Sequence, residues 1–213
     1  MKTDELIDLL STNVEPVKGG QLRNALIVGL AIGGAVAFCL MLGIFGLPAD
    51  VFRGEYLTLK ALALAFTLGL VAAGASFLIR SACPGRPRRG PLILIALLFF
   101  ILLVASCVLL ALTGPAAWGD VVFGPQWAAC LICVPVFAAA PFASLIWALR
   151  RGAPTNLLRT GAVAGLVAGA LGAAVFAFHQ PSGSIPFILI WYGGPIVLCA
   201  VIGAILGPRL LRW

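Results

Sequence analysis

The stretch PLILIALLFFILLVASCVLLALT, residues 91–113, carries no charged side chain along its whole length. A helix needs about 20 consecutive, mainly apolar residues to cross the roughly 30 Å hydrocarbon core of a bilayer. The stretch therefore predicts a transmembrane helix.

Five further apolar runs lie on either side of this one in the 213-residue chain. They cover residues 25–47, 57–79, 127–149, 157–179 and 186–207. Hydrophobic residues make up 62% of the chain and charged residues 10%, against about 45–50% and 25% in soluble domains. The runs do not alternate between apolar and polar residues as the strands of a membrane β-barrel do. The sequence predicts an all-α, polytopic membrane protein: a bundle of six transmembrane helices over residues 25–213.

The positive charges lie mainly in alternate connections between these predicted spans. Arg53 and Lys60 fall on one side, and the other twelve of the fourteen lysines and arginines fall on the opposite side. The twelve are Lys2, Lys18, Arg23, Arg80, Arg86, Arg88, Arg89, Arg150, Arg151, Arg159, Arg209 and Arg212. Since cytoplasmic loops of membrane proteins are enriched in Lys and Arg, both termini are expected in the cytoplasm. Orientation in the lipid bilayer then accounts for the net charge of +7, and no direct nucleic-acid partner is needed.

The first predicted span follows a cytoplasmic tail, residues 1–24, which opens with MKTDELIDLLSTNVEPVKGG. On a helical projection the apolar residues of this tail share one face and the acids share the other, which predicts a short amphipathic helix ending before Pro16. Its acidic face disfavours binding to an anionic membrane surface. Two binding surfaces stay open: an external protein, or the basic loops of this chain. The candidate partner-binding residues are Asp4, Glu5, Leu6, Ile7, Asp8, Leu9 and Leu10.

Apart from Arg159, at the third position of the run 157–179, the predicted spans have no Asp, Glu or Arg between their ends. Ion-coupled transporters and pumps usually place ionisable groups at mid-membrane, and the chain also lacks a catalytic triad, a carboxylate pair or a phosphate loop. We therefore expect no enzyme activity and no cofactor. A small permease or channel for a metal or an uncharged solute, and a structural subunit of a larger complex, remain as alternatives.

Small residues and prolines mark two of the spans. Gly161, Gly165 and Gly169 recur every four residues, a spacing that lets helices approach closely. The spacing fits packing inside the bundle and also fits a homo-oligomer. Pro135 and Pro141 fall within the fourth span, where we expect them to kink the helix.

Four short motifs then resemble one known family. They are MKTDELIDLL at the start, WALRRGAPT after the fourth span, WYGG in the sixth, and LGPRLLRW at the end. In this order they resemble the NrsF-like (negative regulator of sigma F) membrane anti-sigma factors. The resemblance implies a bacterial inner-membrane protein that holds an extracytoplasmic-function sigma factor inactive and releases it on oxidative or heavy-metal stress. It also implies that the acidic tail contacts the sigma factor.

The six cysteines are Cys39, Cys83, Cys107, Cys130, Cys133 and Cys199. The resemblance points to a sensing pair, one cysteine early in the fourth span and one at the outer end of the fifth. Cys130 matches the first position, but Gln180 stands at the second, so the pair cannot form as in relatives. Cys130 and Cys133 are three residues apart and share a helical face. They are candidate redox-sensing residues, and with His179 they form a candidate soft-metal site. The plainer interpretation is that buried cysteines act as small apolar residues and that His179 lies at the surface.

Overall fold

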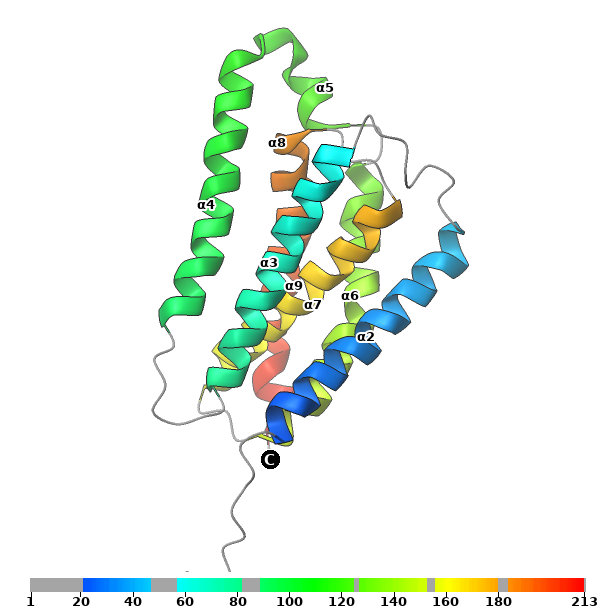
Figure 1. Cartoon of the computed structure of the whole chain (residues 1–213), viewed down its shortest axis with the longest axis vertical. Coiled ribbons are helices and arrows are strands. Elements are labelled where there is room, and N and C mark those ends of the chain that lie inside the picture. Colours follow the sequence, from blue (N-terminus) through cyan, green and yellow to red (C-terminus); the bar gives the residue numbers. More distant parts are fainter. Residues whose placement is uncertain are drawn as a thin grey trace, which may run out of the picture.

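The computed structural model describes residues 21–46, 57–81, 89–124, 127–152, 156–179 and 184–212. These residues form helices and short connections with no strand among them, and six of the helical segments are long and apolar enough to cross a membrane (Figure 1). The predicted all-α, six-span bundle is therefore confirmed. Because a bilayer core offers no water to backbone N–H and C=O groups, helices satisfy those groups within each segment.

Five of the six spans are single helices, and the sixth is composite. The single helices are α2 (Gln21–Phe45), α3 (Leu57–Ser81), α4 (Arg89–Leu112), α6 (Trp127–Leu149) and α7 (Leu157–His179). The sixth span is built from α8 (Ile185–Phe187), the π-helix η3 (Ile188–Tyr192) and α9 (Gly193–Leu210). A 3₁₀ turn, η2 (Pro115–Ala117), and the short helix α5 (Trp118–Val122) connect α4 towards α6.

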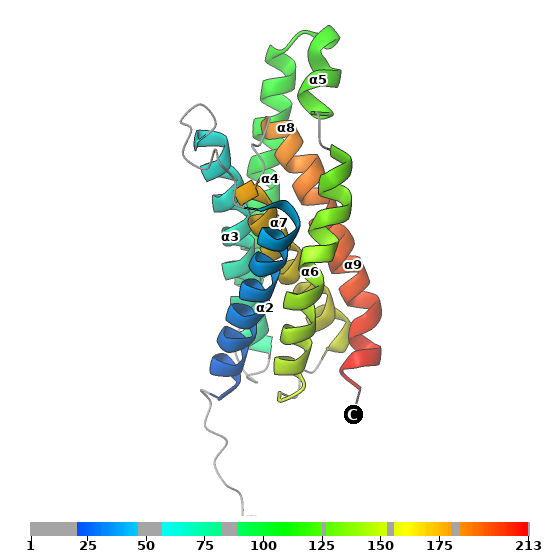
Figure 2. The same ribbon diagram turned by 90° about the vertical axis from the view of Figure 1, so that its right-hand side faces the viewer.

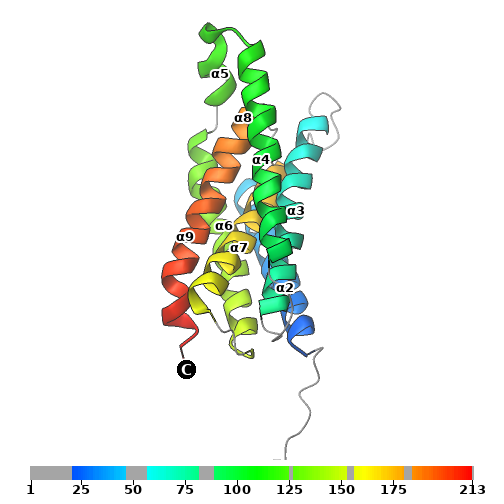
Figure 3. The same ribbon diagram turned by 90° about the vertical axis from the view of Figure 1, so that its left-hand side faces the viewer.

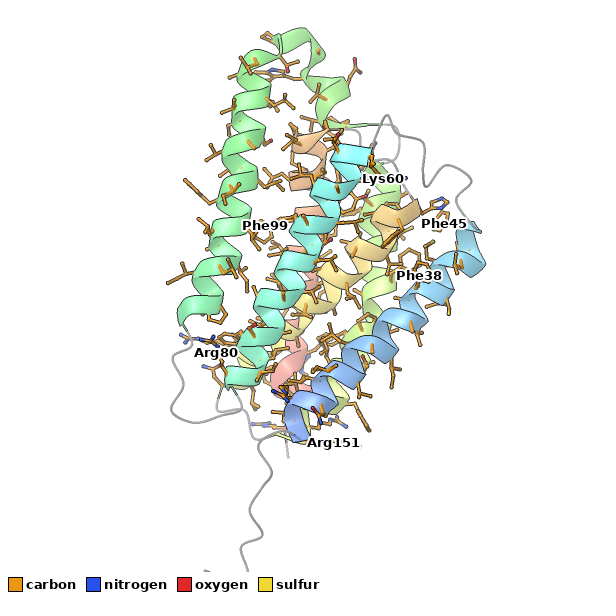
Figure 4. All side chains as sticks on the ribbon, in the orientation of Figure 1. Phe38, Phe45, Lys60, Arg80, Phe99 and Arg151 are labelled. Atoms are coloured by element: carbon orange, nitrogen blue, oxygen red, sulfur yellow. The ribbon has the colours of Figure 1, made fainter. Side chains whose placement is uncertain are left out.

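The two ends of the bundle differ in their side chains. Arg80 and Arg151 lie at the lower end in Figure 4, and Lys60 lies near the upper end. We call the end with Arg80, Arg150, Arg151 and Arg209 the arginine end. We call the other end, with Trp118, Phe123, Trp127 and Trp191, the aromatic end.

Helix α7 lies at the centre of the bundle. Of its 18-residue membrane segment, 78% is buried inside the protein, and α9, α6, α3 and α2 all pack against it (Figures 2 and 3). Its buried positions are mainly Gly, Ala and Val, so neighbouring helices can approach it from several sides.

Helices α7 and α9 touch through their backbones. A Cβ atom added to Gly161 would collide with the carbonyl oxygen of Gly203, and one added to Gly165 would collide with that of Cys199. The relation is mutual, because a Cβ on Gly203 would collide with the carbonyl oxygen of Gly161. The glycines spaced by four residues thus serve packing within this chain, which is one of the two alternatives that the sequence left open.

Helix α6 packs against the next face of α7 in a similar way. A Cβ on Gly172 would lie 2.7 Å from the carbonyl oxygen of Val134. Pro135 and Pro141 both lie inside α6, which continues without a break from residue 127 to residue 149. A Cβ on Gly33 of α2 would lie 2.5 Å from the Cα of Pro141. Helix α2 therefore comes close to α6 at Pro141, a residue without a backbone N–H.

Helix α4 lies at the periphery. Only 17% of its 18-residue membrane segment is buried, and most of its large apolar side chains are exposed, including Ile93, Phe100 and Ile101. The ring of Phe99 on α4 packs edge to face on the ring of Phe66 on α3, with 5.3 Å between the ring centroids. On a membrane helix such exposed side chains face lipid.

Several Ser and Thr hydroxyls inside the helices donate to a carbonyl oxygen of the preceding turn. The hydroxyl of Thr67 donates to the carbonyl oxygen of Ala63 at 2.9 Å, and that of Ser76 donates to Ala72 at 2.8 Å. Asn156 caps α7, because its Oδ1 accepts from the backbone N–H of Arg159 at 3.0 Å. Gly46 ends α2 with a φ of 75°, the left-handed conformation typical of a helix C-terminal glycine.

Candidate functional site

The predicted partner-binding residues Asp4–Leu10 lie outside the described residues. The structure does place the point where the tail joins the bundle, because α2 begins with Gln21 at the arginine end (Figure 1). Residues 1–20 therefore connect to the bundle at the arginine end, and the C-terminal residues of α9 lie at the same end.

The arginine end is strongly basic. Arg23, Arg150, Arg151, Arg159, Arg209 and Arg212 are exposed there. Asp120, on α5 at the aromatic end, is the sole carboxylate side chain in the part of the chain that the structure describes. The described arginine end thus presents positive charge without acidic side chains, and a negatively charged group fits it best.

Two of these arginines have defined contacts. The Nε of Arg150 donates a 2.8 Å hydrogen bond to the carbonyl oxygen of Leu210, which ties the end of α6 to the end of α9. This is a favourable place for a cation, since the C-terminal carbonyls of a helix carry partial negative charge. The guanidinium of Arg151 lies over the ring of Trp147, 3.9 Å from its centroid, a typical cation–π geometry.

Cys130 and Cys133 lie one turn apart near the start of α6, in the half of the bundle nearer the aromatic end. The Cys130 side chain is fully buried in the hydrophobic core, whereas Cys133 is half-buried. An oxidant that approaches this conformation from outside the protein can therefore reach Cys133 more easily than Cys130.

His179 ends α7 and stacks on Phe45, the last residue of α2, with 4.5 Å between ring centroids. Its buried Nδ1 has no hydrogen-bond partner among the described residues. No group of three or more His, Cys, Asp or Glu side chains in the described ranges could hold a metal ion. Cys130, Cys133 and His179 do not form such a group in this conformation, and a role of these residues in metal binding stays a prediction.

A hydrogen-bonded junction at the aromatic end was not predicted from the sequence. Ser184 donates to the carbonyl oxygen of Val121 at 2.6 Å, and the Nε1 of Trp191 donates to that of Val122 at 2.8 Å. The ring of Trp191 also packs on Trp127, with 5.0 Å between centroids. The end of α5 is thereby attached to α8 and η3 at the start of the sixth span.

The π-helix η3 lies directly beside this junction. The backbone N–H of Gly193 donates to the carbonyl oxygen of Ile188, five residues earlier. Pro195, two residues on, has no N–H to offer the carbonyl of Trp191, which is a local cause for the break in the α-helical pattern. Single π turns of this kind often occur at functional sites.

The described helices carry no Asp, Glu, Lys, Arg or His at mid-membrane. Lys60 and Arg80 lie near the two ends of α3, and the described arginines of the other spans also lie at helix ends. Such an arrangement lacks the intramembrane charges typical of ion and proton pathways.

Comparison with known proteins identifies relatives of the whole chain. The sequence profile of the family described as "Negative regulator of sigma F", NrsF, matches residues 10–213. The chain belongs to the NrsF family. The resemblance seen in the sequence motifs is thereby confirmed. The matched region includes Leu10 but not the other six predicted partner-binding residues.

Two relatives align with the chain over their full lengths. The "Anti-sigma-F factor NrsF" of Caulobacter vibrioides is 32% identical over 222 residues, and the "Probable anti-sigma-F factor NrsF" of Azospira oryzae is 26% identical over 213 residues. In both alignments 100% of each chain is covered. No solved structure matches the chain.

Proposed function

We propose that this protein is a membrane anti-sigma factor that binds a sigma factor and holds it inactive. The observation that carries the proposal is the NrsF family match over residues 10–213, together with full-length alignment to two relatives named as anti-sigma-F factors. The partner is a sigma factor of the extracytoplasmic-function class, and the protein lies in the inner membrane of a bacterium.

The arginine end faces the cytoplasm in this proposal. Exposed arginines gather at that end, and cytoplasmic loops of membrane proteins are enriched in Lys and Arg. A sigma factor acts in the cytoplasm, so the end that binds it must be on that side. Both termini then lie in the cytoplasm, since α2 begins and α9 ends at the arginine end.

The acidic tail is the binding element. Sigma factors present partly basic surfaces to promoter DNA, and the described arginine end would repel such a surface. Asp4, Glu5 and Asp8 supply negative charge of the opposite sign, and Leu6, Ile7, Leu9 and Leu10 supply an apolar face for a groove. An amphipathic helix laid into an apolar groove is a recurring mode of peptide recognition.

Release of the sigma factor follows oxidation at the cysteines of α6 in this proposal. A peroxide transfers one oxygen atom to a thiolate, which gives a sulfenic acid and a hydroxide ion that is protonated to water. Cys130 is the proposed sensor, and because its thiol is buried in the core one turn from Cys133, a peroxide reaches it only when the surrounding helices separate. A polar sulfenic acid at Cys130 would disturb that core, so oxidation would favour a different helix arrangement.

Co-purification tests the binding function. The full-length protein, carried in detergent, should recover the sigma factor encoded nearest to its gene, and a protein lacking residues 1–18 should not. The triple substitution Asp4→Asn, Glu5→Gln, Asp8→Asn removes only the charge and should weaken recovery about tenfold or more, the effect expected for several charge-assisted contacts. The double substitution Ser11→Ala, Thr12→Ala is the matched control and should recover the sigma factor normally.

The outcomes separate the two parts of the proposal. Failure of the full-length protein to retain any sigma factor would contradict the anti-sigma function. Equal recovery by the truncated protein would leave that function in place but would exclude the tail as the binding element.

A reporter of sigma-dependent transcription tests the sensing step. In cells with Cys130→Ser, peroxide should no longer release the sigma factor, while the protein stays in the membrane fraction. The Cys199→Ser variant is a control for loss of a buried thiol elsewhere in the bundle. An undiminished peroxide response in Cys130→Ser would exclude Cys130 as the sensor.

A further inference from the structure

An apolar groove of about 250 Å³ opens between α6, α7 and α9. Small residues of α7, Gly165 and Ala168, line it between the two other helices. Pro135 and Phe142 form the α6 wall, and Ile202 and Leu206 form part of the α9 wall. Figure 2 shows α6 and α9 running side by side, with α7 behind them.

The groove faces the surroundings of the bundle and lies within the membrane segments. Ile202 is 42% exposed, and Ala139, another lining residue, is also exposed. The lining is apolar except for the thiol of Cys199. A surface of this kind at membrane depth requires an apolar occupant, since water gains no hydrogen bonds from it.

Two arginines, Arg150 and Arg209, lie at the ends of the two helices that form the walls of the groove. Phe142 precedes the end of α6 by seven residues and Leu206 precedes the end of α9 by four, which is about 10 Å and 6 Å along the helices. Arg150 follows α6 directly, and its Nε reaches across to the carbonyl oxygen of Leu210 on α9. Arg209, exposed, is the neighbour of Leu210 in the sequence.

We infer that the groove binds one anionic phospholipid, with an acyl chain between α6 and α9 and its phosphate at Arg150 and Arg209. The hydrogen bond to Leu210 uses one of the five N–H donors of Arg150, and an arginine can give two parallel hydrogen bonds to a phosphate. Basic pockets between transmembrane helices on the cytoplasmic side are suited to such head groups. The inference rests on the membrane location and does not depend on the sigma factor.

Charge favours a lipid over a second copy of the chain. A parallel dimer through this groove would bring Arg150 and Arg209 of both copies together. No acidic side chain among the described residues of the arginine end would offset that repulsion. An anionic lipid neutralises the same charges.

Native mass spectrometry of the full-length protein in detergent tests this assignment. Dioleoyl phosphatidylglycerol should bind more tightly than dioleoyl phosphatidylcholine. Ala139→Phe should abolish the preferred binding by filling the groove, with Ile202→Trp as a second filling variant from the opposite wall. Arg209→Gln should raise the Kd for phosphatidylglycerol about tenfold, whereas Arg23→Gln, an exposed arginine on α2, should leave it unchanged.

Three results would overturn the inference. The first is equal binding of the two lipids, and the second is an equal effect of Arg23→Gln and Arg209→Gln, which would mean general attraction to basic charge. The third is a dimer in the wild-type protein that Ala139→Phe and Ile202→Trp convert to a monomer, which would make the groove an interface between copies. Circular dichroism and thermal melts confirm that each variant is folded.

Discussion

Helices α7 and α4 have nearly the same length, 23 and 24 residues, and opposite surroundings. Of the 18-residue membrane segments, 78% of α7 is buried in protein but only 17% of α4. The less buried helix is the more hydrophobic one, which is the reverse of the pattern in soluble proteins. In lipid, burial between helices depends on close packing of small residues and not on the removal of apolar surface from water.

The largest expected effect comes from enlarging a glycine on the central helix. Gly165→Leu places a side chain on the carbonyl oxygen of Cys199, and a backbone atom cannot move aside without separating α7 from α9. We expect a loss of about 3 kcal/mol or more, the upper range for overpacking. Thermal unfolding in detergent measures it. Ala96→Leu on the exposed face of α4 is the matched control, and an equal loss there would contradict the comparison.

A smaller effect is expected where a glycine meets a side chain. A Cβ on Gly74 of α3 would collide with the Cγ2 methyl of Val167 on α7. Gly74→Ala should destabilise the protein by about 1–3 kcal/mol, and adding Val167→Ala should restore part of that loss because the two sites share a contact. Strictly additive losses in the double variant, measured by the same melts, would show that α3 and α7 do not meet in this way.

Substitutions of two neighbouring residues of α4, Phe99 and Phe100, should differ in their effect on stability because the two side chains lie on different faces of the helix. Phe99 packs edge-to-face on Phe66 and lies beside Gly193 at the start of α9, whereas Phe100 is 61% exposed. Phe99→Ala should cost about 1 kcal/mol for the lost aromatic pair, and Phe100→Ala should have almost no effect on the melting temperature. A larger loss for Phe100→Ala would place protein, not lipid, on the outer face of α4.

The smallest expected effect is at the aromatic end. Trp191→Phe keeps an aromatic ring but removes the hydrogen bond to Val122, which should cost about 0.6 kcal/mol, the average for such bonds in a membrane protein. Trp127→Phe is the control, because the Trp127 indole makes no hydrogen bond within the described part of the chain. Equal melting temperatures for the two variants would show that this bond contributes nothing to stability.

The course of the spans could be predicted from the sequence because long uncharged runs have few alternatives in a membrane. The predicted span 157–179 has the same bounds as α7, and Gly161, Gly165 and Gly169 marked the face on which another helix lies. The sequence did not predict that this helix is α9, since the spacing of small residues indicates that some helix lies close but not which one.

The contacts at the two ends were beyond prediction for a different reason. The bonds from Trp191 to Val122 and from Arg150 to Leu210 join residues 69 and 60 positions apart, and a tryptophan or arginine at a helix end has many possible acceptors. Pro195 indicated in the sequence that the α-helical hydrogen bonds break nearby. That proline alone does not fix the position of the π turn, Ile188–Tyr192. The acidic tail, the part proposed to bind the sigma factor, lies outside the described residues, so its helix stays a prediction.

The backbone contact between α7 and α9 has a mechanical consequence. Gly161 and Gly203 meet backbone to backbone, because a Cβ on either would collide with the carbonyl oxygen of the other. Neither residue has a side-chain rotamer that could change and absorb a small displacement. A displacement of α9 at this contact would therefore push directly on the backbone of α7, and we expect the two helices to move as a pair. A stimulus received at one end would therefore reach the other as a shift of this pair against α2, α3 and α6, and the contact itself would not slide.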